Sequence, residues 1–176
     1  LDPDNEALRD SYAFLLQKAR ENNEDLTFGG IFRAAKTVQH SRNCARQWND
    51  MGKNESSLSA KDILLRTKFF AVSIQAMVIR KSFILENNLQ QVEGAGQDTL
   101  FSWELLSAAN SLSAYTQPVH IYYAATAGSV TNTVTPKYFE KFLLLQSPKL
   151  HWLKENGLLN EYMETRYVFY TKGWVL

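Results

Sequence analysis

The sequence predicts an α/β protein in which helices flank a sheet and a helical extension follows it. Two observations support this fold class. Apolar residues recur at helical spacing in several stretches, and short β-branched or aromatic runs alternate with them. A third observation, a dense series of leucines and aromatic residues after Pro136, predicts the C-terminal helices.

The N-terminal part predicts a helix followed by a buried strand. Asp4 or Asn5 can cap a helix over 6–22, where leucine, tyrosine and alanine recur on one face. The run 26–32 contains a glycine pair and has the composition of a strand. From 33 to 52 the pattern turns polar and basic, which indicates an irregular, partly exposed segment.

The middle of the chain predicts shorter elements. Ser59 can cap a short helix over 62–65, and the last part of the apolar run 69–79 favours a strand. Ser82 can cap a helix over 83–87, and 90–96 is a loop. A helix begins near Asp98.

The last third predicts a strand over 119–123, with Pro118 at its entry, where a missing amide hydrogen does least harm. A small, polar loop follows over 128–135. Pro136 then opens a helix, and apolar residues continue at helical spacing as far as Phe169.

Composition excludes some function classes. The 176 residues suffice for one ordinary domain with a proper core, and 45% are hydrophobic and 21% charged. The formal net charge of +1 offers no overall attraction to nucleic acid. No apolar run approaches the roughly 18 residues that span a bilayer. The single cysteine, Cys44, forms no internal disulfide, so a cytoplasmic protein is the default expectation.

The run Gly94-Ala95-Gly96-Gln97-Asp98 places one carboxylate directly behind a glycine-rich turn and in the first turn of an apolar helix. A catalytic base can be held in such a place. An ordinary helix-initiating aspartate that favours the helix dipole is the alternative.

Four segments, in order, resemble the second half of an inverting family 2 glycosyltransferase with the GT-A fold. They are Leu1-Asp2-Pro3-Asp4-Asn5, the stretch 76–89, Gly96-Gln97-Asp98-Thr99-Leu100-Phe101, and Ile121-Tyr122-Tyr123 with Gly128-Ser129-Val130-Thr131-Asn132. The resemblance reaches to about Lys141. It implies a partial GT-A-like fold with a mixed sheet.

The resemblance also implies site residues. Asp98 matches the catalytic base, Asp2 and Asp4 match the Asp-x-Asp metal motif, and Gly128, Ser129 and Thr131 match a loop near the donor diphosphate. Two departures stand out. Gln97 replaces the family's usual glutamate, and the stretch 124–127 lacks its usual arginine.

Each of the other candidates has a structural alternative. Asp2 and Asp4 point to one side of an extended segment and can clamp Mn²⁺ or Mg²⁺, but Asp-Pro-Asp-Asn is equally a turn sequence. His120 is a donor or metal contact, or a core histidine. Gln97 and Trp48 are candidate acceptor contacts, and Trp48 can equally anchor a solvated loop.

These expectations define two regions. Residues 1–135 form the catalytic, acceptor-side half of a GT-A-like domain whose nucleotide-binding half would lie upstream of Leu1, and 136–176 form the helical extension. The predicted function is inverting transfer from a nucleotide sugar, by family resemblance a UDP-sugar, to a glycan, lipid-linked or protein acceptor of a bacterial cell surface. The predicted location is the cytoplasm or the inner face of the membrane.

Two other functions remain open. A glycosyltransferase-like subunit without activity agrees with Gln97 and the missing arginine. A helical interaction domain that dimerises through its C-terminal helices agrees with the aromatic residues between Phe139 and Trp174.

Overall fold

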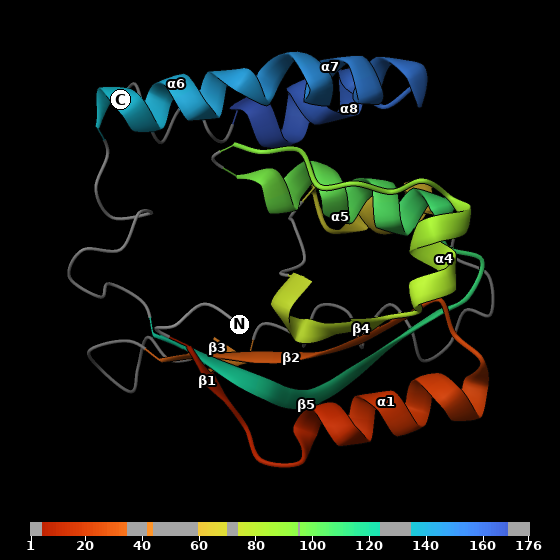
Figure 1. Ribbon diagram of the computed structural model, residues 1–176. Coiled ribbons are helices and arrows are strands. Elements are labelled where there is room, and N and C mark those ends of the chain that lie inside the picture. The colour runs from red at the N-terminus through yellow and green to blue at the C-terminus, as the bar shows by residue number, and fades with distance from the viewer. Residues whose placement is uncertain are drawn as a thin grey trace.

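The computed structural model describes residues 5–34, 42–43, 60–69, 74–94, 96–123 and 135–168. It is a mixed α/β structure in layers (Figure 1). Helix α1 lies on one side of the sheet and α5 on the other, and the C-terminal helices lie beyond α5. The predicted α/β class with flanking helices and a helical extension is confirmed.

The sheet contains both parallel and antiparallel pairs. Its strands are β1 (Glu6–Ala7), β2 (Leu26–Ala34), β3 (Arg42–Asn43), β4 (Met77–Ile79) and β5 (Leu112–Tyr123). Strands β2 and β5 run parallel at the centre, whereas β1 pairs with β5, and β3 and β4 pair with β2, all antiparallel.

The first helix differs from its prediction. Helix α1 spans Ser11–Asn22, and the residues before it form β1 and a turn in which Asp10 has φ 56°. A cap at Asn5 is therefore wrong, because Glu6 and Ala7 pair with Ile121 and His120 of β5. The helix ends as predicted, at Asn23, whose left-handed conformation returns its amide to the carbonyls of Ala19 and Arg20.

Strand β5 is longer than predicted, because it begins at Leu112 and contains Pro118 in its interior. The register with β2 shifts around Gly30, which pairs with Pro118. Such an irregularity accommodates a residue that has no amide hydrogen for the ladder.

Most of the remaining elements are helices close to the predicted positions. The predicted cap at Ser82 is wrong, because α4 begins at Lys81 and Arg80 precedes it. They are α3 (Ala60–Arg66), a 3-10 turn (Ile74–Ala76), α4 (Lys81–Glu86), α5 (Gln97–Ala108), α6 (Pro136–Leu144), α7 (Gln146–Glu155), α8 (Leu159–Tyr162) and a π-helical turn (Met163–Tyr167). Thr135 caps α6 by accepting from the amide of Tyr138, and Pro136 follows it. Within the described ranges, no helix is long and apolar enough to cross a membrane.

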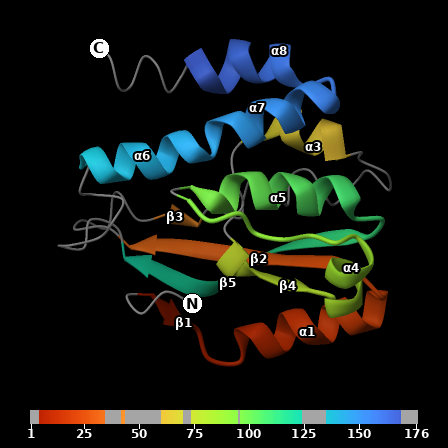
Figure 2. The ribbon, with the colours of Figure 1, turned by 45° about the horizontal axis from the view of Figure 1, so that its top comes forward.

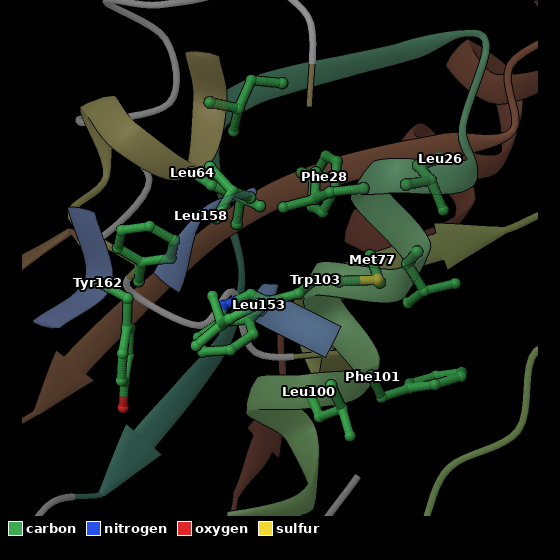
Figure 3. Packing of buried hydrophobic residues seen from close by; sticks show 14 of the residues in the cluster. Leu26, Phe28, Leu64, Met77, Leu100, Phe101, Trp103, Leu153, Leu158 and Tyr162 are labelled. Carbon is green, nitrogen blue, oxygen red and sulfur yellow. The ribbon is translucent and has the colours of Figure 1, made fainter. Parts of the chain in front are cut away.

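The main core lies between the sheet and the C-terminal helices. Trp103 of α5 is fully buried at its centre and contacts the rings of Phe69, Trp152 and Tyr162 at centroid distances of 5.6 to 5.8 Å. Figure 3 shows Trp103 among side chains from β2 and from the last helices. The helical extension is thus packed into the same core as the sheet, which fixes α5 on both sides.

Candidate functional site

The first turn of α5 holds the predicted base, Asp98. Gly96 precedes the helix with φ 78°, a conformation that glycine adopts without strain, and its carbonyl accepts from the amide of Thr99 (3.1 Å). The Asp98 side chain is half-buried, and Gln91 Nε2 donates to its Oδ1 (3.1 Å). The carboxylate therefore lies at a helix N-terminus, where Gln91 helps to orient it.

Two contacts hold the turn before Asp98, one with the Gln97 side chain and one with Leu145. The amide of Gly94 donates to Oε1 of Gln97 (3.4 Å), so Gln97 closes the turn with its side chain. A β-carbon on Gly94 would lie 2.7 Å from Cγ of Leu145, which belongs to the junction of α6 and α7. The turn thus rests directly on the helical extension.

The N-terminus of α5 shares one end of the molecule with the carboxyl ends of β2 and β5 (Figures 1 and 2). Ligands of open α/β sheets bind outside the carboxyl ends of the strands. In the sequence, Gly128, Ser129 and Thr131 follow the carboxyl end of β5, whereas Trp48 follows β3, the antiparallel partner of β2.

His120 lies inside the sheet. It pairs with Ile31 of β2 and Ala7 of β1, and it is 1% exposed. This burial favours the core-histidine alternative over a ligand contact.

Six of the predicted site residues lie outside the described residues: Asp2, Asp4, Trp48, Gly128, Ser129 and Thr131. In the described part of the chain, no group of three or more His, Cys, Asp or Glu side chains can hold a metal ion. The Asp2–Asp4 metal site stays a prediction, because both residues lie outside the described part of the chain.

The geometry supports one kind of chemistry at the α5 N-terminus. A half-buried carboxylate with a fixed orientation can accept a proton from a hydroxyl group held within hydrogen-bond distance. The backbone amides of the first helical turn interact favourably with a negative charge placed there.

Comparison with solved structures gives the same architecture. The crystal structure of residues 1–349 of S. aureus TarS, a glycosyltransferase, in complex with UDP-GlcNAc superposes with a TM-score of 0.59 at 12% identity, and the match covers 91% of this chain. The structure of TarS 1–349 without a named ligand superposes with a TM-score of 0.60 at 13% identity, and the match covers 98% of this chain. The structure with UDP superposes with a TM-score of 0.56 at 14% identity, and the match covers 93% of this chain. The chain has a glycosyltransferase-like fold.

The chain spans less than half of these neighbours, covering 45%, 47% and 44% of the three TarS structures. No model of a known protein family matches the sequence, and no curated protein matches it either. At this identity the likeness shows the fold alone.

Sequence reasoning missed the polar cluster that supports the sheet next to α5. Asp25, 1% exposed, precedes β2 and forms an ion pair with Arg80, which follows β4. Its other carboxylate oxygen accepts from the amides of Asn110 (2.9 Å) and Ser111 (3.2 Å), in the turn between α5 and β5. An acidic residue directly before an apolar strand was the available signal.

Proposed function

We propose that this chain carries the catalytic base of an inverting glycosyltransferase that uses a nucleotide sugar, and that the base is Asp98. The carrying observation is the position of Asp98 in the first turn of α5, at the end of the molecule where β2 and β5 end. The likeness to TarS, whose structures hold UDP-GlcNAc and UDP, supports the donor class.

In the proposed reaction, Asp98 accepts the proton of an acceptor hydroxyl as its oxygen attacks the anomeric carbon of the donor sugar. The new carbon–oxygen bond forms on the face opposite the diphosphate. The bond to the diphosphate breaks, and the leaving group takes the electron pair. Inversion at the anomeric carbon follows from this geometry, and Gln91 holds the carboxylate toward the hydroxyl.

Asp98→Asn in the complete enzyme tests the proposal. The amide keeps the shape of the carboxylate but accepts no proton, so transfer should fall by about 100-fold or more. The affinity for a UDP-sugar, measured by calorimetry, should stay within about twofold. Retained turnover would rule out Asp98 as the base, and lost donor binding would argue for a donor contact instead.

Asp62→Asn is the matched control. Asp62 is also an acid in the first turn of a helix, α3, and it is exposed. Both substitutions remove a favourable helix-dipole charge, worth about 0.3–1 kcal/mol. Only the change at Asp98 should abolish transfer.

We extend the proposal to a divalent cation held by Asp2 and Asp4. The Mn²⁺ dependence of transfer tests this site, and Asp4→Asn should weaken that dependence.

One observation favours a second function, an interaction surface. Helix α6 has no fully buried residue, and Phe139, Leu143 and Leu144 on it are 43%, 64% and 67% exposed. Large exposed apolar side chains in one region mark an interaction site. Leu143→Glu should abolish self-association in analytical ultracentrifugation if α6 forms a dimer, and a chain that is monomeric before the change refutes that dimer.

A further inference from the structure

A polar groove lies on the far half of α5, away from Asp98. Its volume is about 640 Å³, within the range of small-molecule sites. The end of α4, the loop after it, the second half of α5 and one residue of α7 form its walls. Its polar and aromatic lining residues are Asn87, Asn88, Gln90, Glu104, Ser107 and Trp152.

Glu104 is the charged residue of the groove. Its side chain is half-buried, and burial raises the pKa of its carboxyl group above the usual value. Within the described part of the chain, the Glu104 carboxylate has no hydrogen-bond or ion-pair partner. A partly desolvated carboxyl group without a partner is costly, and a ligand that supplies hydrogen bonds would offset this cost.

Trp152 gives the groove a fixed aromatic wall. Its ring lies 5.7 Å from the fully buried ring of Trp103, with 38° between the planes. A tryptophan supported from behind in this way loses little entropy when a ligand packs on its open side.

The amide side chains come from the end of α4 and the loop after it. Asn87 donates to the carbonyl of Phe83 (2.9 Å), which holds it at the end of α4. Asn88 has φ 52°, a left-handed conformation that asparagine tolerates. Asn88 therefore suits the turn that follows α4. The side chains of Asn88, Gln90 and Ser107 make no hydrogen bonds with other described residues and remain available to a ligand.

These groups select one chemical class. Amides, a hydroxyl and a carboxyl group match a ligand with many hydroxyl groups, and the Trp152 ring matches one apolar face on that ligand. A phosphate would meet Glu104 without a compensating lysine or arginine among the lining residues, so an anionic donor does not fit. A lipid would leave the amides unsatisfied.

We propose that the groove between α4, α5 and α7 binds a neutral carbohydrate chain, with a pyranose ring against Trp152 and its hydroxyl groups on Glu104 and the amides. Glu104 follows Asp98 by six residues, or about 9 Å along the helix. A glycan of a few units can span that distance. The proposal rests on the groove itself and does not require Asp98 to act as a base.

The test is NMR titration of the ¹⁵N-labelled full chain with two neutral hexasaccharides, maltohexaose and the N-acetylglucosamine hexamer. At least one should give saturable shifts in the side-chain amides of Asn87, Asn88 and Gln90 and in the indole of Trp152. Glu104→Ala and Trp152→Leu should each weaken that binding by about tenfold or more. The exposed Glu140→Gln on α6 should not change it.

Each other outcome overturns the proposal. It fails if neither hexamer gives saturable shifts at millimolar concentration, or if both groove variants bind as the parent does. A third titration uses the cationic glucosamine hexamer. If it binds more tightly than both neutral hexamers and Glu104→Gln removes that binding, the groove is a site for a cation and the proposal is wrong. Trp152→Phe guards against a folding defect, since it keeps an aromatic face. Asp98→Asn should bind the hexamer normally, which separates this test from that of the catalytic base.

Discussion

Gly94 and Leu145 are in direct contact across the interface between the loop before α5 and the C-terminal helices. A β-carbon on Gly94 would lie 2.7 Å from Cγ and 2.9 Å from Cδ1 of Leu145, which is 1% exposed. The predicted catalytic half and the predicted helical extension therefore meet at the turn that positions Asp98.

This contact predicts that Gly94→Ala displaces the turn. The added methyl group must push Leu145 or the loop aside, which costs about 1–3 kcal/mol of unfolding free energy. Leu145→Ala alone should cost about 2–5 kcal/mol through a cavity. Together they should cost less than their sum, because the smaller side chain makes room for the methyl group. Urea denaturation of the four proteins measures the coupling.

Gly96→Ala is the control for this cycle. Among the described residues, no atom lies within 4 Å of a β-carbon on Gly96, but its φ of 78° strains any other residue. The change should therefore cost stability through the backbone alone, about 1–2 kcal/mol, and show no coupling to Leu145→Ala. Additivity at Gly94 as well would show that its contact with Leu145 carries no energy.

The ion pair of Asp25 and Arg80 predicts a large loss of stability on Asp25→Ala. The substitution leaves the amides of Asn110 and Ser111 without their acceptor and removes the ion pair of Arg80, which keeps its hydrogen bond to Asn23. Because the Arg80 side chain is 39% exposed, the loss comes mainly from the two amides, and we expect a cost of about 2–4 kcal/mol. Glu21→Ala, which removes the exposed pair with Lys18, should change stability little, because water screens that pair. Similar costs in thermal or urea unfolding would contradict the structural role of Asp25.

The sequence predicts those parts of the fold that local signals define. Helix α5 follows from two glycines and an apolar helical face, and β2 follows from a β-branched, aromatic run. The start of β5 cannot be predicted in this way, because a proline such as Pro118 normally marks the end of a strand. Pro118 lies inside β5 because it pairs with the irregular part of β2.

The candidate site divides in the same way. Asp98 is visible in the sequence because it stands at a glycine turn, where a few adjacent residues define the geometry. The groove at Glu104 and Trp152 is not visible, because these two residues are 48 positions apart in the sequence and only folding brings them together. An acid between Trp103 and Leu105 in an apolar helix is its one local sign.

Gln91 orients the proposed base, so its loss should lower the rate of transfer. Gln91 Nε2 donates to Oδ1 of Asp98 (3.1 Å), and without this bond the carboxylate is held less firmly in the position that accepts the hydroxyl proton. Turnover in Gln91→Leu should therefore fall severalfold with little change in donor KM. Gln17→Leu, which removes a similar bond from Gln17 to Glu21, is the matched control and should leave turnover unchanged. Parent-like turnover in Gln91→Leu would exclude this role.

Lys149 of α7 is a buried charge within the aromatic core. Its side chain is 6% exposed, and Nζ lies 5.6 Å from the ring centroid of Trp103 and 5.8 Å from that of Phe142. Burial, and then the nearby charge of Arg166, lower the pKa of Lys149 from its ordinary 10.5 to about 8. The difference corresponds to about 3 kcal/mol that the protonated form costs the folded state.

Lys149→Met should therefore stabilise the protein at pH 7. Methionine fills a similar volume without a charge, although the two cation–π contacts are lost, so we expect a gain of about 1–3 kcal/mol in the free energy of unfolding. In the parent, Lys149 binds a proton more readily in the unfolded state than in the folded state between pH 8 and pH 10.5. This group therefore makes the stability of the parent rise with pH across that window. Below pH 8, the buried charge destabilises the folded state by the full amount. The advantage of Lys149→Met should therefore shrink between pH 7 and pH 10. Urea denaturation of both proteins at the two pH values measures this, and an advantage that stays constant or grows with pH would contradict a neutral Lys149 at high pH.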